Sequence, residues 1–225
     1  MKLSVIVPTF NEESVIAQTL QAALLTLAPH ELIVADGCST DRTAERARPY
    51  ATLLELPGTR GAALNVAASM ATGDVLLFLH ADTITPTGAA AAICEALQPT
   101  NVIGGAFRLR LDHPSWFAAL VSYNVNLRSS LLNTFFGDQA MFVRRDVFTR
   151  AGGFKEWSVM EDLEILARLR QHGRLILLDQ EVLTSARRHQ RIGWWRTLGT
   201  IWGMTLLHRL GVPGHAMRRW YSPQR

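Results

Sequence analysis

The first eighty residues alternate short apolar runs with amphipathic segments, and this pattern constrains the fold more than any other feature. Continuous runs of Val, Ile and Leu are typical of parallel strands that are buried on both faces. Strands that alternate with helices along the chain indicate an open α/β sheet with helices on both faces. The pattern predicts strands at 3–7, 32–35, 52–55 and 74–79, and helices at 12–26, 40–47 and 61–70.

The pattern changes after about residue 103. The segment 104–111 alternates like an antiparallel strand, so the whole sheet is expected to be mixed. The rest predicts helices at 116–132 and 161–172 and strands at 139–143 and 175–178. We therefore expect one domain over 1–190, with a first half of about 1–103 and a second half of about 104–190, followed by a basic tail, 191–225.

Bulk composition fits a folded intracellular protein. With 225 residues, 48% of them hydrophobic, the chain is long enough for one domain with a sizeable core and too apolar for disorder. Cys38 and Cys94 form no metal-ligand pattern, which favours a reducing compartment, and the N-terminus resembles a buried strand rather than a signal peptide. A cytoplasmic protein is therefore expected.

The formal net charge is +4, and arginine and histidine concentrate after Arg144. A basic surface of this kind suits phosphate groups, anionic lipid headgroups or nucleic acid, or it is simply solvated. No nucleic-acid motif accompanies it, so a nucleic-acid partner is not expected.

The tail segment 192–212 approaches the length of a membrane span, but Arg196 and several glycines interrupt it. An amphipathic helix that carries Trp194, Trp195 and Trp202 would suit the membrane interface. The alternative is a helix that packs on the domain or in a homodimer contact.

Polar residues follow the first two predicted strands directly. Pro8 ends the first strand, and Asn11 is a good N-cap for a helix that begins near Glu12. After the second strand, Ser39 or Thr40 would cap the next helix. Capping does not explain Asp36, whose carboxylate could accept hydrogen bonds from a pyrimidine imide or from ribose hydroxyls.

The next two segments carry residues suited to a diphosphate. Arg60 at a helix start could reach phosphate oxygens, with Asn65 farther along the same helix. His80, Ala81 and Asp82 end the fourth strand, and alternate side chains of an extended segment point the same way. Asp82 could hold a divalent cation, whereas His80 is a second ligand, a ribose contact or a plain strand-end histidine.

The second half supplies further polar groups. Gly137, Asp138 and Gln139 precede a short strand and would line an acceptor pocket, unless Asp138 is only a turn residue. Glu161 and Asp162 open a helix, where they complement its dipole or act on an acceptor proton. Arg187 and Arg188 would close over a diphosphate, meet lipid phosphates or remain solvated.

Taken in order, the segments PTFNE, DGCSTD, RGAALN, LHAD, GDQA and ED resemble glycosyltransferase family 2 over about residues 3–190. The resemblance implies a GT-A fold, a nucleotide-diphosphate sugar donor, Mg²⁺ or Mn²⁺, and inversion at the anomeric carbon. It places Thr9 and Glu12, beside Pro8, at the nucleoside pocket, Asp36 on the base and Arg60 near the base or phosphates. It also matches Asp82 with the last acid of the DxD metal motif and Asp162 with the catalytic base.

Two departures from the family pattern refine this expectation. His80 stands where the first acid of DxD is expected, and the QxxRW motif of processive synthases is absent from the region of Arg187 and Arg188. We therefore expect transfer of a single sugar, with a UDP-sugar favoured, to a hydroxyl acceptor that is lipid-linked or small and soluble. The alternatives are a nucleotidyltransferase and a non-catalytic nucleotide-sugar-binding or membrane-associated protein.

Overall fold

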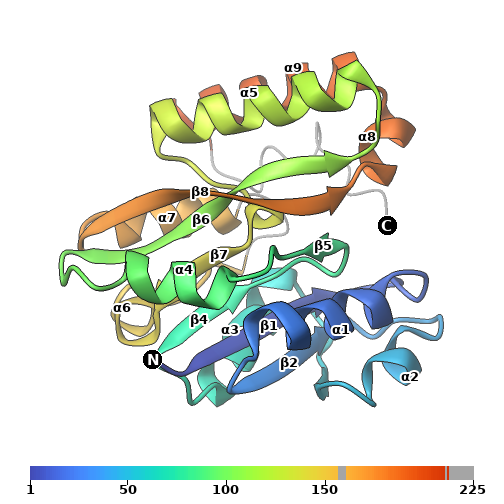
Figure 1. Ribbon diagram of the computed structural model, residues 1–225, viewed down its shortest axis with the longest axis vertical. Coiled ribbons are helices and arrows are strands. Elements are labelled where there is room, and N and C mark those ends of the chain that lie inside the picture. Colours follow the sequence, from blue (N-terminus) through green and yellow to red (C-terminus); the bar gives the residue numbers. More distant parts are fainter. Residues whose placement is uncertain (157–160, 211, 213–225) are drawn as a thin grey trace.

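The computed structural model describes residues 1–156, 161–210 and 212. Its described residues form one mixed sheet of eight strands in the order β3-β2-β1-β4-β7-β6-β8-β5, with helices on both faces (Figure 1). The predicted α/β class is confirmed. The strands are β1 (Leu3–Thr9), β2 (Glu31–Asp36), β3 (Thr52–Glu55), β4 (Val75–Phe78), β5 (Thr83–Ile84), β6 (Val102–Asp112), β7 (Met141–Arg144) and β8 (Arg174–Ser185).

The first four strands along the sheet are parallel, as their uninterrupted apolar runs predict. Alternate residues of β1 face opposite sides: Val5 and Val7 belong to one core cluster, and Ile6 belongs to the other. The neighbouring strands and the helices that cover the two faces supply the rest of these clusters. Since both faces of the strands are buried, polar groups are pushed to the strand ends, where the site lies.

The helices are α1 (Ile16–Leu27), α2 (Thr43–Ala47), α3 (Arg60–Met70), α4 (Ala89–Ala96), α5 (Trp116–Leu132), α6 (Arg145–Arg150), α7 (Glu161–Leu169), α8 (Arg187–Ile192) and α9 (Trp194–Arg209), with a 3₁₀ turn η1 (Gly137–Gln139). The helix expected from residue 12 begins only at Ile16, and its N-terminus has no side-chain cap. Asn11 adopts a left-handed φ of 53° instead of capping, so the predicted cap is wrong.

The antiparallel prediction for the segment 104–111 is half right. Strand β6 is antiparallel to β7, but it is parallel to β8 over most of its length. The two-residue β5 pairs with the far edge of β8, and this pairing brings the chain after β4 next to the end of β8. The sheet therefore joins the predicted first and second halves without a break.

Helices α5 and α9 lie together outside β6 and β8, at the end of the molecule away from α1 and α2 (Figure 1). Their shared core contains Leu109 and Leu111 of β6, Val121 and Val125 of α5, and Leu198 of α9. Packing on the domain, which was one of the alternatives for the tail helix, is thus observed. None of the helices in the described residues is long and apolar enough to cross a membrane, and residues 211 and 213–225 of the predicted tail lie outside the described part.

Candidate active site

The parallel strands β1, β2 and β4 end at the same edge of the sheet, which is where open α/β folds bind ligands. Thr9 and Asp36 are the last residues of β1 and β2 and pair directly across the sheet. His80 and Asp82 follow β4 within two to four residues. The fold therefore brings the predicted donor-side residues to one edge.

Asp36 is held tightly in this edge. Its Oδ1 accepts hydrogen bonds from the hydroxyls of Thr9, at 2.8 Å, and Ser39, at 2.6 Å, and its Oδ2 accepts the backbone N–H of Ser39 at 2.8 Å. The residue is only 1% exposed. A carboxylate offers about four acceptor positions, so one remains for a ligand.

The loops after β1 and β2 are cross-linked by side chains. Oδ1 of Asn11 accepts the backbone N–H of Thr40 at 2.9 Å, and the backbone N–H of Glu12 donates to Oγ1 of Thr43 at 2.7 Å. Asp41 accepts the backbone N–H of Thr43, so it serves the start of α2, where Ser39 or Thr40 was expected. The two loops thus form one rigid rim beside Asp36.

Arg60, His80 and Gly137 meet at the centre of the edge. The guanidinium of Arg60 donates to Nε2 of His80, and its Nε lies 3.5 Å from Oε1 of Glu161. A guanidinium has only donors, so Nε2 of His80 must accept, which leaves the proton on Nδ1. Burial lowers the pKa of His80 well below its usual value, and Arg60 and Arg188 lower it further. His80 is therefore neutral, and its Nε2 is not available to a metal in this arrangement.

Arg187 at the start of α8 joins two carboxylates. Its Nη2 lies 2.8 Å from Oε2 of Glu12 and 3.6 Å from Oδ2 of Asp82. Burial raises the pKa of Asp82, the Glu12 carboxylate raises it further, and Arg187 opposes both effects. Arg187 thus supplies the positive charge between two acids that would otherwise repel each other.

Asp162 is fixed by the backbone. Its Oδ2 accepts the N–H of Gly137 at 2.8 Å, and its Oδ1 accepts the N–H of Leu163 at 2.9 Å. The neighbouring Glu161 is 5% exposed, and burial raises its pKa, against the effect of Arg60. The predicted pair at the start of α7 therefore reaches the same edge as Arg60 and His80.

Behind Gly137 lies a buried arginine that sequence reasoning missed. Arg128 of α5 is 0% exposed, its Nη2 donates to Oε1 of Gln139 at 3.2 Å, and its guanidinium lies 3.7 Å from the centre of the Phe136 ring. Arg128 is the only charged residue in α5, which is the signal that could have revealed it. Burial lowers its pKa to about 10, although Asp138 and Asp162 raise it.

Asp138 lies close enough to this arginine to feel its charge. Its Oδ1 is buried and has no hydrogen-bond partner among the described residues. Burial raises the pKa of Asp138 to about 6, with Arg128 and Arg188 lowering it and Asp162 raising it. Its carbonyl oxygen accepts from Thr184 of β8 at 3.1 Å, which ties the turn to the strand that leads to Arg187.

Two predicted ligand residues are already bound to the protein. Both amide atoms of Asn65 bond to the backbone of Phe154, each at 2.8 Å, and they clamp α3 to the loop before α7. Gln139 is 0% exposed, and its amide bonds to Arg128, Ser129 and the backbone of β6. Both side chains therefore shape the walls of the site from behind.

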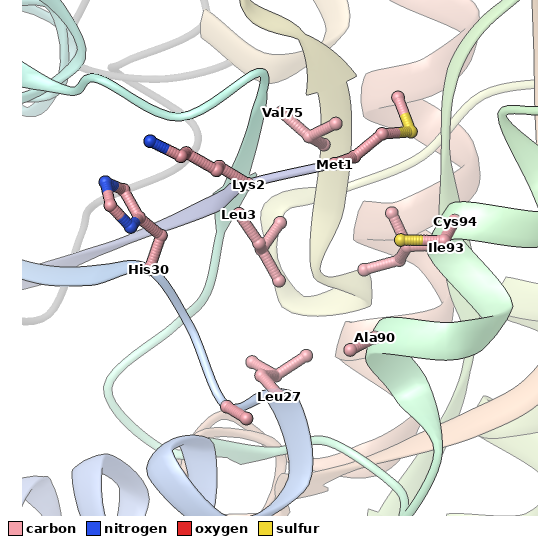
Figure 2. A pocket seen from close by; sticks show the side chains of 10 residues that line it. Met1, Lys2, Leu3, Leu27, His30, Val75, Ala90, Ile93 and Cys94 are labelled. Atoms are coloured by element: carbon pink, nitrogen blue, oxygen red, sulfur yellow. The ribbon is translucent and has the colours of Figure 1, made fainter.

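A cavity of about 370 Å³ lies at the opposite end of β1 and β4. Figure 2 shows the side chains that line it. Its lining comes from the first residues of β1, the end of α1 and one face of α4, and includes Leu3, Leu27 and Ile93. It holds no carboxylate, so it does not compete with the edge described above as a nucleotide site.

A divalent cation fits the edge in one way. No group of three His, Cys, Asp or Glu side chains in the described part of the chain could enclose one. Mg²⁺, however, is usually bound by one or two carboxylates together with substrate phosphates. Asp82 and Glu12 already share one positive charge in Arg187, so the donor set suits a cation that arrives with a diphosphate.

Comparisons with known proteins point to one family. A family model described as Glycosyl transferase family 2 matches residues 4–151. Poly(ribitol-phosphate) beta-N-acetylglucosaminyltransferase TarS from Staphylococcus aureus (strain Mu50) is 37% identical over 93 residues, which are 36% of this chain and only 16% of TarS. A PGL/p-HBAD biosynthesis glycosyltransferase from Mycobacterium tuberculosis (strain H37Ra) is 27% identical over 179 residues, 73% of this chain and 68% of that protein.

Among solved structures, glucosyl-3-phosphoglycerate synthase from Mycobacterium tuberculosis is similar in fold. It superimposes with a TM-score of 0.66 at 21% identity, over 94% of this chain and 81% of that one. That crystal structure contains Mn²⁺, uridine diphosphate and glucosyl-3-phosphoglycerate.

Proposed function

The chain belongs to glycosyl transferase family 2, and we propose that it transfers one sugar from a nucleotide-diphosphate sugar, UDP being favoured, to an acceptor hydroxyl with inversion. The observation that carries this proposal is the hydrogen bond from Gly137 to Asp162, because it sets a fixed carboxylate beside the Arg60–His80 pair. A proton acceptor next to cationic groups is what attack on the anomeric carbon of a diphosphate sugar requires.

The nucleoside would bind along the rim of β1 and β2. Pro8, Thr9 and Glu12 form one side of this rim, and the last acceptor position of Asp36 faces the base in this proposal. A rigid rim favours binding because little loop entropy is lost when the ligand arrives.

The diphosphate would lie among Arg60, Arg187 and Arg188, beside His80 and Ala81. Burial lowers the pKa of Arg188 and Arg60 lowers it further, whereas the carboxylates of Asp138, Asp82 and Asp162 raise it, so this guanidinium is close enough to sense both Arg60 and these acids. Arginines bind phosphate through paired N–H groups and stabilise the negative charge that grows on a departing diphosphate.

The acceptor hydroxyl would enter beside Gly137 and Asp138 and lose its proton to Asp162. Its oxygen then bonds to the anomeric carbon from the face opposite the diphosphate, and the bond from that carbon to the phosphate oxygen breaks. Glu161 does not take the proton in this proposal, because it is buried against Arg60 and holds that arginine in place.

We propose Asp82 as the protein ligand of Mg²⁺ or Mn²⁺, with Glu12 as its neighbour. Such a cation supplies Lewis-acid charge to the diphosphate oxygens when it is bound. His80 is better suited to position Arg60, since its Nε2 accepts from that guanidinium.

A cytoplasmic setting is part of the proposal. Cys38 and Cys94 are free thiols, as expected in a reducing compartment. The acceptor is a hydroxyl compound, and a lipid-linked acceptor would bring the protein to the inner face of a membrane.

One observation favours a second candidate, a protein that binds nucleotide sugars without turnover. His80, which stands in place of the first DxD acid, is hydrogen-bonded to Arg60, so Asp82 has one fewer protein ligand beside it for binding a cation. This candidate predicts that Asp162→Asn leaves ligand binding unchanged and that no transfer occurs in either form.

The test is hydrolysis and transfer across UDP-, GDP- and dTDP-sugars with Mn²⁺ or Mg²⁺, for the wild type, Asp82→Asn and Asp162→Asn. Asp179→Asn is the matched control, because Asp179 is an exposed surface acid that pairs with Arg108. We expect activity with one donor, lost in both site variants and kept in the control. Nucleotide binding without turnover would favour the second candidate, and no nucleotide binding would refute both.

A further inference from the structure

Helix α5 carries an apolar stripe on the face that turns away from the sheet. Trp116, Tyr123 and Leu131 are 63%, 63% and 68% exposed. They are seven and eight residues apart, about two helical turns each, so they lie on one face. The opposite face holds the buried Val121 and Val125. A helix that is apolar on both faces is normally covered on both.

Helix α9 repeats this stripe beside it. Trp195, Trp202 and Leu210, at or just beyond the helix, are exposed at the same spacing. The Trp195 ring lies 5.3 Å from that of Phe117, and Nε1 of Trp202 is 3.4 Å from Oδ1 of Asn124. Each contact joins residues 78 positions apart, so the two helices run parallel and in register.

The stripes therefore form one continuous surface, which we call the α5–α9 face: Trp116, Tyr123 and Leu131 with Trp195, Trp202 and Leu210. The ring centroids of Trp116 and Phe117 are 3.7 Å apart, and Phe117 in turn contacts Trp195. At this end of the face, aromatic rings therefore bridge the two helices. Figure 1 shows the two helices outside β6 and β8, at the end of the molecule away from α1 and α2. The sequence suggested only the α9 part.

The two helices of this face carry arginines and no acidic residue. The sequence has no acidic residue between His113 and Gly137 and none from Val182 to Arg225, a segment that carries eight arginines. Arg191 and Arg196 are exposed, and in the chain they come four residues before and one residue after Trp195. Exposed tryptophan and tyrosine next to arginine is the composition that favours the interface of an anionic bilayer.

The same charge argues against other occupants. A second copy of the chain would bring like charges together across the contact, which costs binding energy. A nucleic acid would use the arginines and the rings, but Leu131 and Leu210 give bases nothing to stack on.

We propose that the α5–α9 face docks on the surface of an anionic lipid bilayer, with its aromatic and leucine side chains in the interface and Arg191 and Arg196 at the headgroups. Docking goes beyond the transfer reaction and does not depend on it. Helix α8 begins at Arg187 and leads directly into α9, so docking would hold the candidate active site near a lipid-borne acceptor.

The experiment is flotation of the full chain with vesicles of phosphatidylcholine alone and of phosphatidylcholine mixed with phosphatidylglycerol. The test variant is Tyr123→Ser with Trp195→Ser. The control is Leu25→Ser with Met70→Ser, two exposed apolar residues on α1 and α3. We expect the wild type and the control to float with the anionic vesicles and the test variant to bind at least about tenfold more weakly.

Three results would overturn the proposal. The first is that the wild type does not bind anionic vesicles, and the second is that the test variant binds them as well as the control does. The third is that light scattering finds a wild-type dimer, which the substitutions of the test variant dissociate and those of the control do not. The last result would make a second copy the occupant. Because the assay uses no sugar nucleotide, its failure leaves the proposed transfer untouched, and loss of transfer activity leaves docking untouched.

Discussion

The backbone N–H of Gly137 donates a hydrogen bond of 2.8 Å to Oδ2 of Asp162, across 25 residues of chain. This bond joins the turn before β7 to the start of α7. On its other side, Gly137 presses against His80 and Arg60: a Cβ built at this glycine would lie 2.5 Å from Nε2 of His80 and 2.9 Å from Nη2 of Arg60. One residue without a side chain therefore lets three candidate active-site groups come together.

Replacing Gly137 with alanine is expected to separate these groups. The added methyl must displace the His80 ring and the Arg60 guanidinium, and misplaced catalytic groups commonly cost about a hundredfold in rate. We expect kcat to fall by about 10- to 100-fold, with the melting temperature within a few degrees of the wild type. Gly199→Ala is the control, since a Cβ there meets nothing within 4 Å. Equal kcat for both variants would contradict this prediction.

Much of the fold could be read from the sequence because strand burial leaves a clear pattern. Strand β3 and helix α5 begin and end where predicted, and α3 begins only one residue early. The missed elements lack such a pattern. Helix α4 is mostly alanine, and the two-residue β5 exists only because β8 lies beside it, which is a tertiary contact that local sequence does not contain.

The site could be predicted only in part. Strand ends pointed to Asp36 and Asp82, because an acid after an apolar run is conspicuous, and the start of a helical pattern pointed to Asp162. The sequence could not show that Arg60 occupies Nε2 of His80, since this contact joins α3 to the loop after β4. Nor could it show that the side chain of Asn65 is hydrogen-bonded to the backbone of a residue 89 positions away.

Ionisation of the buried Asp138 carboxylate is expected to lower the free energy of unfolding as the pH rises. Its pKa is about 6 in the folded chain against 3.8 as the usual value, so the folded state holds the proton more tightly than the unfolded state. The contribution of Asp138 to the free energy of unfolding is therefore most favourable below about pH 4. It falls as the pH rises to about 6, and above that pH the loss stays constant. The shift already includes the attraction of Arg128, so the net effect of ionised Asp138 is unfavourable.

Asp138→Asn removes that penalty. We expect the variant to match the wild type near pH 4 and to exceed its free energy of unfolding by about 1–3 kcal/mol at pH 8. Urea denaturation at the two pH values measures this, with Asp179→Asn as the exposed control. A difference between variant and wild type that does not change with pH would refute the assignment.

The guanidinium of Arg187 and a divalent cation at Asp82 are expected to compete for the same carboxylates. Its guanidinium lies between Glu12 and Asp82, so any Mn²⁺ at Asp82 must overcome that positive charge. At this half-exposed position the repulsion is about 1 kcal/mol. We expect Arg187→Ala to bind Mn²⁺ alone about fivefold more tightly, as measured by electron paramagnetic resonance of the free ion, while transfer activity falls because the diphosphate loses a partner.

Arg42→Ala provides the comparison for this experiment, because Arg42 pairs with Glu13 on the surface at 3.4 Å. Its Mn²⁺ affinity should equal that of the wild type. If Arg187→Ala binds Mn²⁺ no better than this control, Arg187 does not compete for the cation.

Arg128 predicts a stability coupling to Asp138 through the buried side of the site. Arg128 partly offsets the cost of burying the ionised Asp138 carboxylate, so deleting Arg128 alone leaves that carboxylate without compensation, which costs about 3–5 kcal/mol. Arg128→Met keeps the length of the stem and deletes the charge, so at pH 8 it should destabilise the wild type by about 3 kcal/mol. In the Asp138→Asn background we expect the same substitution to cost about 1–3 kcal/mol less.

Urea denaturation of the four proteins measures this coupling. The control is Arg110→Met, which breaks an exposed pair with Glu181 and should cost under about 1 kcal/mol. An equal cost of Arg128→Met in both backgrounds would mean that the two charges do not sense each other and that Arg128 serves the turn only through Gln139 and the Phe136 ring.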